Sequence, residues 1–227
     1  MIDRSILLKP VPQDRRYHDF ADRRTLLGIP NFWNVISNAA FLIVGIAGLR
    51  AMHERGAAPP LDPAYLVLFL ALIFVSFGSA YYHLAPDNSR LTWDRLPMTL
   101  AFMAFVAIVI GERIDPHLGR RCLPFLLLAG VASVAYWHFS ERRGHGDLRL
   151  YLLVQFLPLV LIPLIMLLFS PPLSKGYGIW GMFAAYVAAK ILELFDERIF
   201  RLHGVISGHT LKHLAAAVGT YFLLVSF

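Results

Sequence analysis

Four side chains that can bind a metal ion lie in or against apolar segments of this 227-residue sequence: His83, Asp94, His209 and His213. Residues four apart share one face of a helix, so His209 and His213 can face one ion, and Ser79 lies one turn before His83. Three imidazoles with an open fourth position form the ligand set of a catalytic zinc site, where bound water has a pKa of about 7. Ionisable groups at membrane depth are costly, so we interpret the set as a functional site.

The composition is that of an integral membrane protein. Hydrophobic residues make up 57% of the sequence and charged residues only 16%, which is too apolar for an ordinary soluble domain. The first 30 residues lack an apolar run with a cleavage site, so we expect the first span to direct insertion. Cys122 is the only cysteine, which excludes an internal disulfide and a cysteine-rich metal site. The net charge is +6, but the basic residues form no stripe on a soluble face, so we expect no nucleic-acid partner.

Seven segments are long and apolar enough to cross a bilayer as helices, which takes roughly 20 residues. We therefore expect an all-α fold, a seven-transmembrane helix bundle, with residues 1–31 as a polar amino-terminal tail and residues 32–227 as one transmembrane domain. The predicted spans cover about 32–51, 62–84, 92–112, 121–140, 149–169, 176–196 and 207–227.

The connectors predict both the orientation and the place of the site. Thirteen basic residues, including Arg4, lie on the side of the amino terminus and six, including Lys175, on the other, so the positive-inside rule places the amino terminus in the cytoplasm. The second span ends on the amino-terminal side, and the third and seventh begin there. The histidines and Asp94 should therefore meet at similar depth, as a buried metal site on that side.

Other interpretations of the same residues fit less well. A serine hydrolase using Ser79 would need an exposed turn such as GxSxG, and Phe77–Ala80 reads Phe-Gly-Ser-Ala. Ser79 could also serve only to pack helices beside Gly78, and Asp94 could simply pair with a nearby arginine. A di-iron oxidase would need several histidine boxes, but the six other histidines stand singly or without box spacing. Three histidines at matched depth together with a carboxylate favour a single metal.

In combination, these residues resemble those of the alkaline ceramidase branch of the seven-helix superfamily that includes the adiponectin and progestin receptors, as in a bacterial-type member. The resemblance extends over nearly the whole chain, through residues 31–38, Ser79 to His83, Asp94, and Gly208 to His213. Each motif alone is weak. An SxxxH motif, an aspartate eleven residues later and a late HxxxH motif are specific together.

The resemblance implies a role for each residue. His83, His209 and His213 would bind zinc, Asp94 would act as general base on the metal-bound water, and Ser79 would steady the scissile carbonyl. The implied reaction is hydrolysis of the N-acyl amide of ceramide or a related lipid to a fatty acid and a lipid amine. The implied partner is therefore a membrane lipid.

The resemblance also implies a second metal, calcium, with two departures from the family pattern. The positions that match the calcium ligands of eukaryotic ceramidases are Asp19, Asp22 and Asn31, with Arg23 and Arg24 close by. Calcium prefers several anionic oxygens, so a weaker site is expected. Lys212, inside the HxxxH motif, stands where the eukaryotic enzymes usually carry tryptophan, which predicts a different pocket wall.

Two rival functions from other classes use the same residues. A receptor-like signalling protein would hold the zinc as a structural ion, but the sequence shows no sizeable soluble segment to engage a partner. A transporter would place carboxylate or histidine pairs along a path through several spans. Here the predicted ligands cluster at one end, which favours a fixed site.

Overall fold

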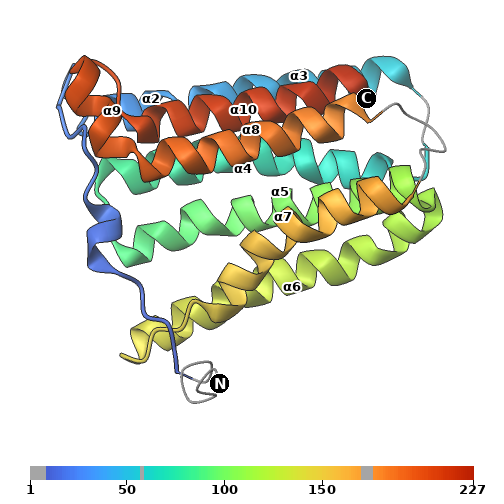
Figure 1. Ribbon diagram of the computed structural model, residues 1–227, viewed down its shortest axis with the longest axis horizontal. Coiled ribbons are helices and arrows are strands. Elements are labelled where there is room, and N and C mark those ends of the chain that lie inside the picture. The colour runs from blue at the N-terminus through green and yellow to red at the C-terminus, as the bar shows by residue number, and fades with distance from the viewer. Residues whose placement is uncertain (1–8, 57–58, 170–175) are drawn as a thin grey trace.

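Helices form at every position where a span is predicted. The computed structural model describes residues 9–56, 59–169 and 176–227, and in these ranges it contains no strand (Figure 1). The long helices are α2 with α3 (Phe32–Ile36 and Ala39–Arg55), α4 (Asp62–Leu84), α5 (Asn88–Arg113), α6 (Pro116–Arg142), α7 (Arg149–Leu168), α8 (Tyr177–Leu194) and α10 (Gly208–Ser226). Two short helices, η1 (Arg15–His18) and α9 (Asp196–His203), lie at the end of the bundle where Figure 1 draws α9.

The helices are those of a multi-pass membrane protein. Within the described ranges, five are long and apolar enough to cross a membrane: α2 with α3, α4, α5, α6 and α7. A sixth is obtained when α8 and α9, which meet at an angle of 74°, count as one broken span. The helix α10 lies alongside α8 and α3 in the bundle (Figure 1). The predicted all-α bundle is confirmed, whereas its sidedness stays a prediction, and Arg4 and Lys175 lie outside the described residues.

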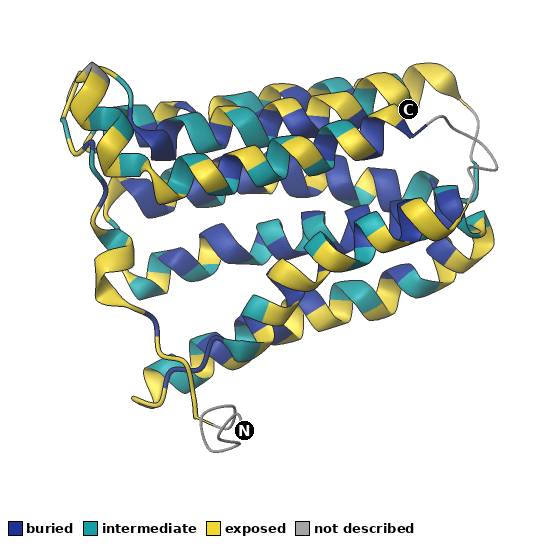
Figure 2. Ribbon diagram, in the orientation of Figure 1, coloured by how far each residue is buried: buried dark blue, intermediate teal, exposed yellow. Residues whose placement is uncertain are grey.

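The helix α5 lies at the centre of the bundle. It packs against α4, α6 and α7, and 72% of its most apolar window is buried. The helices α3 and α6 bury about a third of theirs, 33% and 28%, and much of their outer surface is exposed (Figure 2). In a membrane protein such outer surfaces face lipid, so apolar side chains there are expected.

Side-chain caps set where the helices that carry the site begin. The Asp87 carboxylate accepts a hydrogen bond from the Arg90 amide at 2.8 Å and starts α5. Ser207 accepts one from the Thr210 amide at 3.3 Å and starts α10 immediately before the HxxxH motif. Such caps satisfy amides that have no partner within the helix.

The described part of the amino-terminal segment, residues 9–31, crosses the ends of the helices at one end of the bundle (Figure 1). The Leu148 amide donates to the Val11 carbonyl at 2.8 Å, and Arg95 donates to the Gln13 side chain at 2.6 Å. The Val11 amide reaches Asp147, whose pKa is held well below its usual range by hydrogen bonds from Arg149. Asp147 therefore stays ionised at neutral pH and anchors the segment.

The helices α4 and α5 touch backbone to backbone beside the predicted site. A Cβ atom added at Gly78 would lie 2.2 Å from the carbonyl oxygen of Trp93. Only glycine allows this approach, because real Cβ contacts are never so short. The next residue on each helix, Ser79 on α4 and Asp94 on α5, is a predicted site residue, so this contact fixes the spacing between them.

We expect Gly78→Ala to destabilise the protein by about 1–3 kcal/mol, because the added methyl group forces the two backbones apart. The matched control is Gly130→Ala, where the nearest atom is the Met103 side chain at 3.2 Å, which can move slightly. The measurement is the thermal unfolding midpoint of each purified variant in detergent. Equal midpoints for the two variants would contradict the tight contact between α4 and α5.

Candidate metal centre

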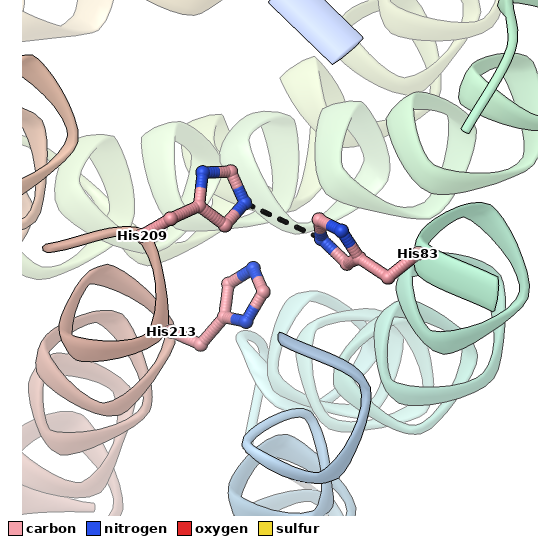
Figure 3. Close-up of side chains that lie close together, drawn as sticks. All are labelled: His83, His209 and His213. Atoms are coloured by element: carbon pink, nitrogen blue, oxygen red, sulfur yellow. Dashed lines mark hydrogen bonds between the residues drawn. The ribbon is translucent and has the colours of Figure 1, made fainter. Parts of the chain in front are cut away.

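Three histidines from two helices meet at one point of the bundle. His83 lies near the end of α4, whereas His209 and His213 lie in the first turns of α10, and their rings turn toward one another (Figure 3). One ring nitrogen from each lies within 4.8 Å of those of the other two. All three side chains are buried, with exposures of 1%, 5% and 4%. The predicted convergence of the three histidines is present in the structure.

The spacing of the His83 and His209 rings fits two ligands of a tetrahedral metal ion. Zinc–nitrogen bonds of about 2.0–2.1 Å place tetrahedral ligands roughly 3.3–3.4 Å apart. The Nε2 atoms of His83 and His209 are 3.3 Å apart. The Nδ1 atom of His83 is buried and has no hydrogen-bond partner. Neutral imidazoles gathered this closely suit a divalent transition ion, and the all-nitrogen donor set suits zinc.

The ring of His213 is held by residues at the break between α2 and α3. The Ser37 hydroxyl lies 2.8 Å from His213 Nδ1 and 3.3 Å from the Asn34 carbonyl oxygen. Asn34 in turn accepts a hydrogen bond from the Thr210 hydroxyl at 2.8 Å, on the same turn of α10 as His209. With Nδ1 engaged, Nε2 of His213 is left to face the cluster. Such contacts behind a ligand orient its ring and raise metal affinity.

The amino-terminal segment covers the other two rings, and α9 joins this segment to α10. The Phe20 ring packs 4.6 Å from the His83 ring and 4.5 Å from the His209 ring, measured between centroids. Asp196 accepts from the His209 amide at 2.6 Å and from the Ala21 amide at 3.0 Å. One carboxylate therefore joins the start of the HxxxH helix to the segment that covers the cluster.

Asp94 and Ser79 lie together beside the histidines. Both are buried, with exposures of 8% and 3%, and the Ser79 side chain is a hydrogen-bond partner of the Asp94 carboxylate. The Asp94 Oδ1 atom is buried without a hydrogen-bond partner, which is costly unless another molecule uses it. The carboxylate thus has an oxygen free to accept a proton.

A cavity of about 90 Å³ connects these residues to the interior of the bundle. Its polar end contains Ser79, Asp94 and His213. Successive turns of α4, α5 and α10 then continue its wall away from the histidines, mostly with apolar side chains. These are Leu72 and Val75 on α4, Met98, Ala101 and Phe102 on α5, and Ala216 on α10, with Phe41 of α3 and Met182 of α8 beside them.

The residues predicted for calcium are paired with other groups. Asp19 is exposed and bonds to Arg23 at 2.7 Å, and both carboxylate oxygens of the buried Asp22 bond to Arg24 at 2.8 Å. The Asn31 side chain donates to the carbonyl oxygen of His83 at 2.8 Å. Calcium binding here stays a prediction, and it would have to displace both arginines.

Four residues that hold the cluster in place were not predicted from the sequence: Phe20, Asn34, Ser37 and Asp196. Asn34 and Ser37 lie in residues 31–38, which carry part of the family resemblance. The sequence therefore marked this stretch, but it did not indicate that these two side chains hold the His213 ring and α10. Phe20 and Asp196 had no such signal, because each reaches the cluster through contacts between segments far apart in the chain. Asp196 is 175 residues from Ala21.

Replacement of Ser37 with alanine is expected to weaken zinc binding by about 10- to 100-fold, because the His213 ring loses the contact that orients it. The affinity is measured by competition with a chelator of known strength. Ser133→Ala is the matched control, since that hydroxyl is also buried but donates only to the Gly130 carbonyl of its own helix. Equal affinities in the two variants would show that Ser37 does not support the ligand.

Comparison with known proteins agrees with this arrangement. The sequence model of the Ceramidase family matches residues 28–227. Alkaline ceramidase 3 of Mus musculus is 31% identical to the chain over 81 residues, which is 35% of this chain and 28% of that relative. The aligned segment is thus less than a third of the relative's length. The family match, however, covers most of the chain and includes the three histidines, Asp94 and Ser79, and this protein therefore belongs to the ceramidase family.

Proposed function

We propose that this protein is a zinc-dependent intramembrane amidohydrolase. Its substrate is ceramide or a related N-acyl lipid, which it cleaves to a free fatty acid and a lipid amine. The observation that carries the proposal is the buried group of three histidines, one of which, His213, lines the polar end of a cavity whose other walls are mostly apolar. Membership of the ceramidase family supports an amide as the bond that is cleaved.

His83, His209 and His213 would hold the ion. A zinc ion with three imidazole ligands supplies Lewis-acid catalysis and lowers the pKa of a water molecule to about 7. Asp94 takes the proton from the attacking water and returns it to the amine as the C–N bond breaks, so one carboxylate serves as base and then as acid. Ser79 turns its hydroxyl to the scissile carbonyl and donates a hydrogen bond to its oxygen.

The cavity supports a lipid substrate. Apolar side chains such as Leu72 and Val75 on α4 and Ala101 on α5 line it beyond the polar end, so a fatty acyl chain can lie there while its amide stays beside Asp94. Burial of each CH₂ group contributes about 0.8 kcal/mol. The substrate partner is therefore a membrane lipid. We further propose that the amino terminus and the site face the cytoplasm, on the distribution of basic residues.

The number of ligands favours catalysis over a structural role for zinc. Structural zinc sites are closed by four protein ligands, whereas catalytic sites keep one position open. Among the described residues the metal-competent group contains three histidines. A receptor-like protein with a structural zinc would be expected to complete the set, so we place hydrolysis first.

We expect His209→Ala and His213→Ala to lose zinc and amide hydrolysis together, because each removes one of three ligands. His53→Ala is the control, since that histidine is exposed near the far end of α3. Zinc is counted per chain by mass spectrometry after purification, and fatty acid release is measured with a panel of N-acyl lipids. Full zinc occupancy in both cluster variants would refute the metal assignment.

Asp94→Asn is expected to keep zinc and to lower turnover by about 10²- to 10⁴-fold, since the amide cannot accept the proton from water. Zinc content and the rate of fatty acid release are measured on the same preparation. Unchanged turnover would remove Asp94 from the mechanism. If the wild-type protein binds zinc but releases no fatty acid from any lipid, the receptor-like function gains support.

A calcium ion bound by Asp19, Asp22 and Asn31 remains part of the proposal as a secondary site. Because Arg23 and Arg24 compete for the two carboxylates, Arg24→Ala should strengthen calcium binding by freeing Asp22. Binding is measured by calorimetry in calcium-free buffer, with Arg201→Ala, an exposed arginine on α9, as control. If calcium binds neither to the wild-type protein nor to the Arg24→Ala variant, the proposed calcium site is refuted.

A further inference from the structure

Two lysines and one glutamate form a cluster in the wall of the cavity. Lys190 and Glu193 lie on α8, and Lys212 lies on α10. The Lys190 ammonium donates to one Glu193 carboxylate oxygen at 2.8 Å, and the Lys212 ammonium donates to the other at 2.9 Å. All three side chains are mostly buried, with exposures of 26%, 19% and 17% for Lys190, Glu193 and Lys212. All three line the cavity that contains Asp94 and His213.

The charges of this cluster do not balance. Two ammonium groups share one carboxylate, which leaves one positive charge over. Asp94 is the other acidic residue that lines the cavity, and it can offset one positive charge. The three histidines would bind a divalent ion as neutral ligands and leave its charge uncompensated. The loaded cavity is therefore cationic, and unpaired charge at membrane depth is costly.

A role in holding α8 to α10 does not account for the second lysine. One ion pair between Glu193 and Lys212 already joins the two helices, and buried ion pairs give weak evidence for stability because desolvation offsets their attraction. Each ammonium has three donors, and the structure shows one on Glu193 for each lysine. The Lys190 ammonium also lies over the Phe156 ring, 5.7 Å from its centroid, and the other donors of the two ammonium groups can meet a ligand in the cavity.

The cluster lies at the polar end of the cavity. Lys212 directly precedes the proposed ligand His213. Lys190 and Glu193 lie one turn apart on α8, on the cavity wall that faces Lys212. Away from His213, beyond Val75 and Ala101, the cavity wall is mostly apolar and suits an acyl chain, although Thr220 and Gln155 also line the cavity. An anionic group close to the amide, on its amine side, would thus meet the two ammonium groups.

We propose that Lys190, Glu193 and Lys212 form an anion-binding subsite, and that the lipid amide cleaved here carries a carboxylate or phosphate on its amine part. This inference rests on the proposed amidohydrolase function and narrows its substrate class. A neutral ceramide leaves the excess charge unpaired, whereas an anionic N-acyl lipid neutralises it. The subsite acts on substrate choice, while Asp94 and the histidines act on the amide.

The test compares two ligands that differ only in charge, N-palmitoylglycine and the neutral N-palmitoylglycinamide. Affinities are measured by equilibrium dialysis on the zinc-loaded Asp94→Asn protein, which binds the amides without cleaving them, in neutral detergent at one detergent concentration. We expect the carboxylate to bind at least about tenfold more tightly, as for hydrogen bonds between charged groups. Equal affinities for the two ligands would overturn the proposal.

Variants locate this preference in the protein. Lys212→Met keeps the length of the side chain and leaves Glu193 paired with Lys190, and it should reduce the preference to about threefold or less. Lys212→Arg should retain most of it. The matched control is Arg201→Gln, which removes one positive charge at an exposed pair with Glu197 outside the cavity. If Lys212→Met and Lys190→Met both keep the full preference for the carboxylate over the neutral amide, the anion binds elsewhere and the subsite is refuted.

Two further measurements separate this inference from the proposed function. Palmitate carries the carboxylate of the acyl product and serves as a third ligand. If Lys212→Met weakens the binding of palmitate but not of the two amides, and the amides bind equally well, the proposed substrate class is wrong. Glycine release from N-palmitoylglycine tests hydrolysis separately. A Lys212-dependent preference without cleavage of any N-acyl lipid would support the subsite and refute the hydrolase. If both amides bind with equal affinity and are cleaved at equal rates, the hydrolase is supported and the subsite is refuted.

Discussion

The structure depends on the cost of placing ionisable groups at membrane depth. His83, His209, His213 and Asp94 are each less than a tenth exposed, and their neighbours limit the cost. Ser37 contacts His213, Phe20 covers His83 and His209, and Ser79 bonds to Asp94. Two side-chain atoms of these four residues, His83 Nδ1 and Asp94 Oδ1, are buried and have no hydrogen-bond partner within the described part of the chain. Buried polar atoms left unsatisfied in this way commonly mark functional sites.

This constraint links parts of the chain that are far apart. Gly78 lets α4 approach α5 and fixes Ser79 near Asp94. Asp196 accepts hydrogen bonds from the amides of Ala21 and His209. It therefore joins the amino-terminal segment, which covers the histidines, to α10, which supplies two of them. A change in the position of the amino-terminal segment would therefore alter the exposure of the cluster as well as its own contacts.

The sequence predicted the helices from local patterns, and it predicted the convergence of the histidines from the direction in which successive spans cross the membrane. Apolar length sets the helices, and the HxxxH spacing sets which side chains share a face. The break between α2 and α3, which positions Ser37, has no apolar signal. The amino-terminal segment was predicted as a polar tail with candidate calcium ligands, and its packing through Phe20 was not predicted because it depends on long-range contacts. The pairing of Asp22 with Arg24 also needed the fold, since Asn34 and the α9–α10 connector surround them.

The position of Lys212 separates substrate choice from metal binding. His209 and His213, four residues apart, face the proposed metal position, whereas the Lys212 side chain reaches Glu193 on α8. The same turn of α10 thus builds the metal group and places a cation in the cavity wall. A substitution at this position changes the charge that the lipid meets and leaves the three ligands in place. Related chains with an uncharged residue there would keep the same chemistry and select a neutral lipid.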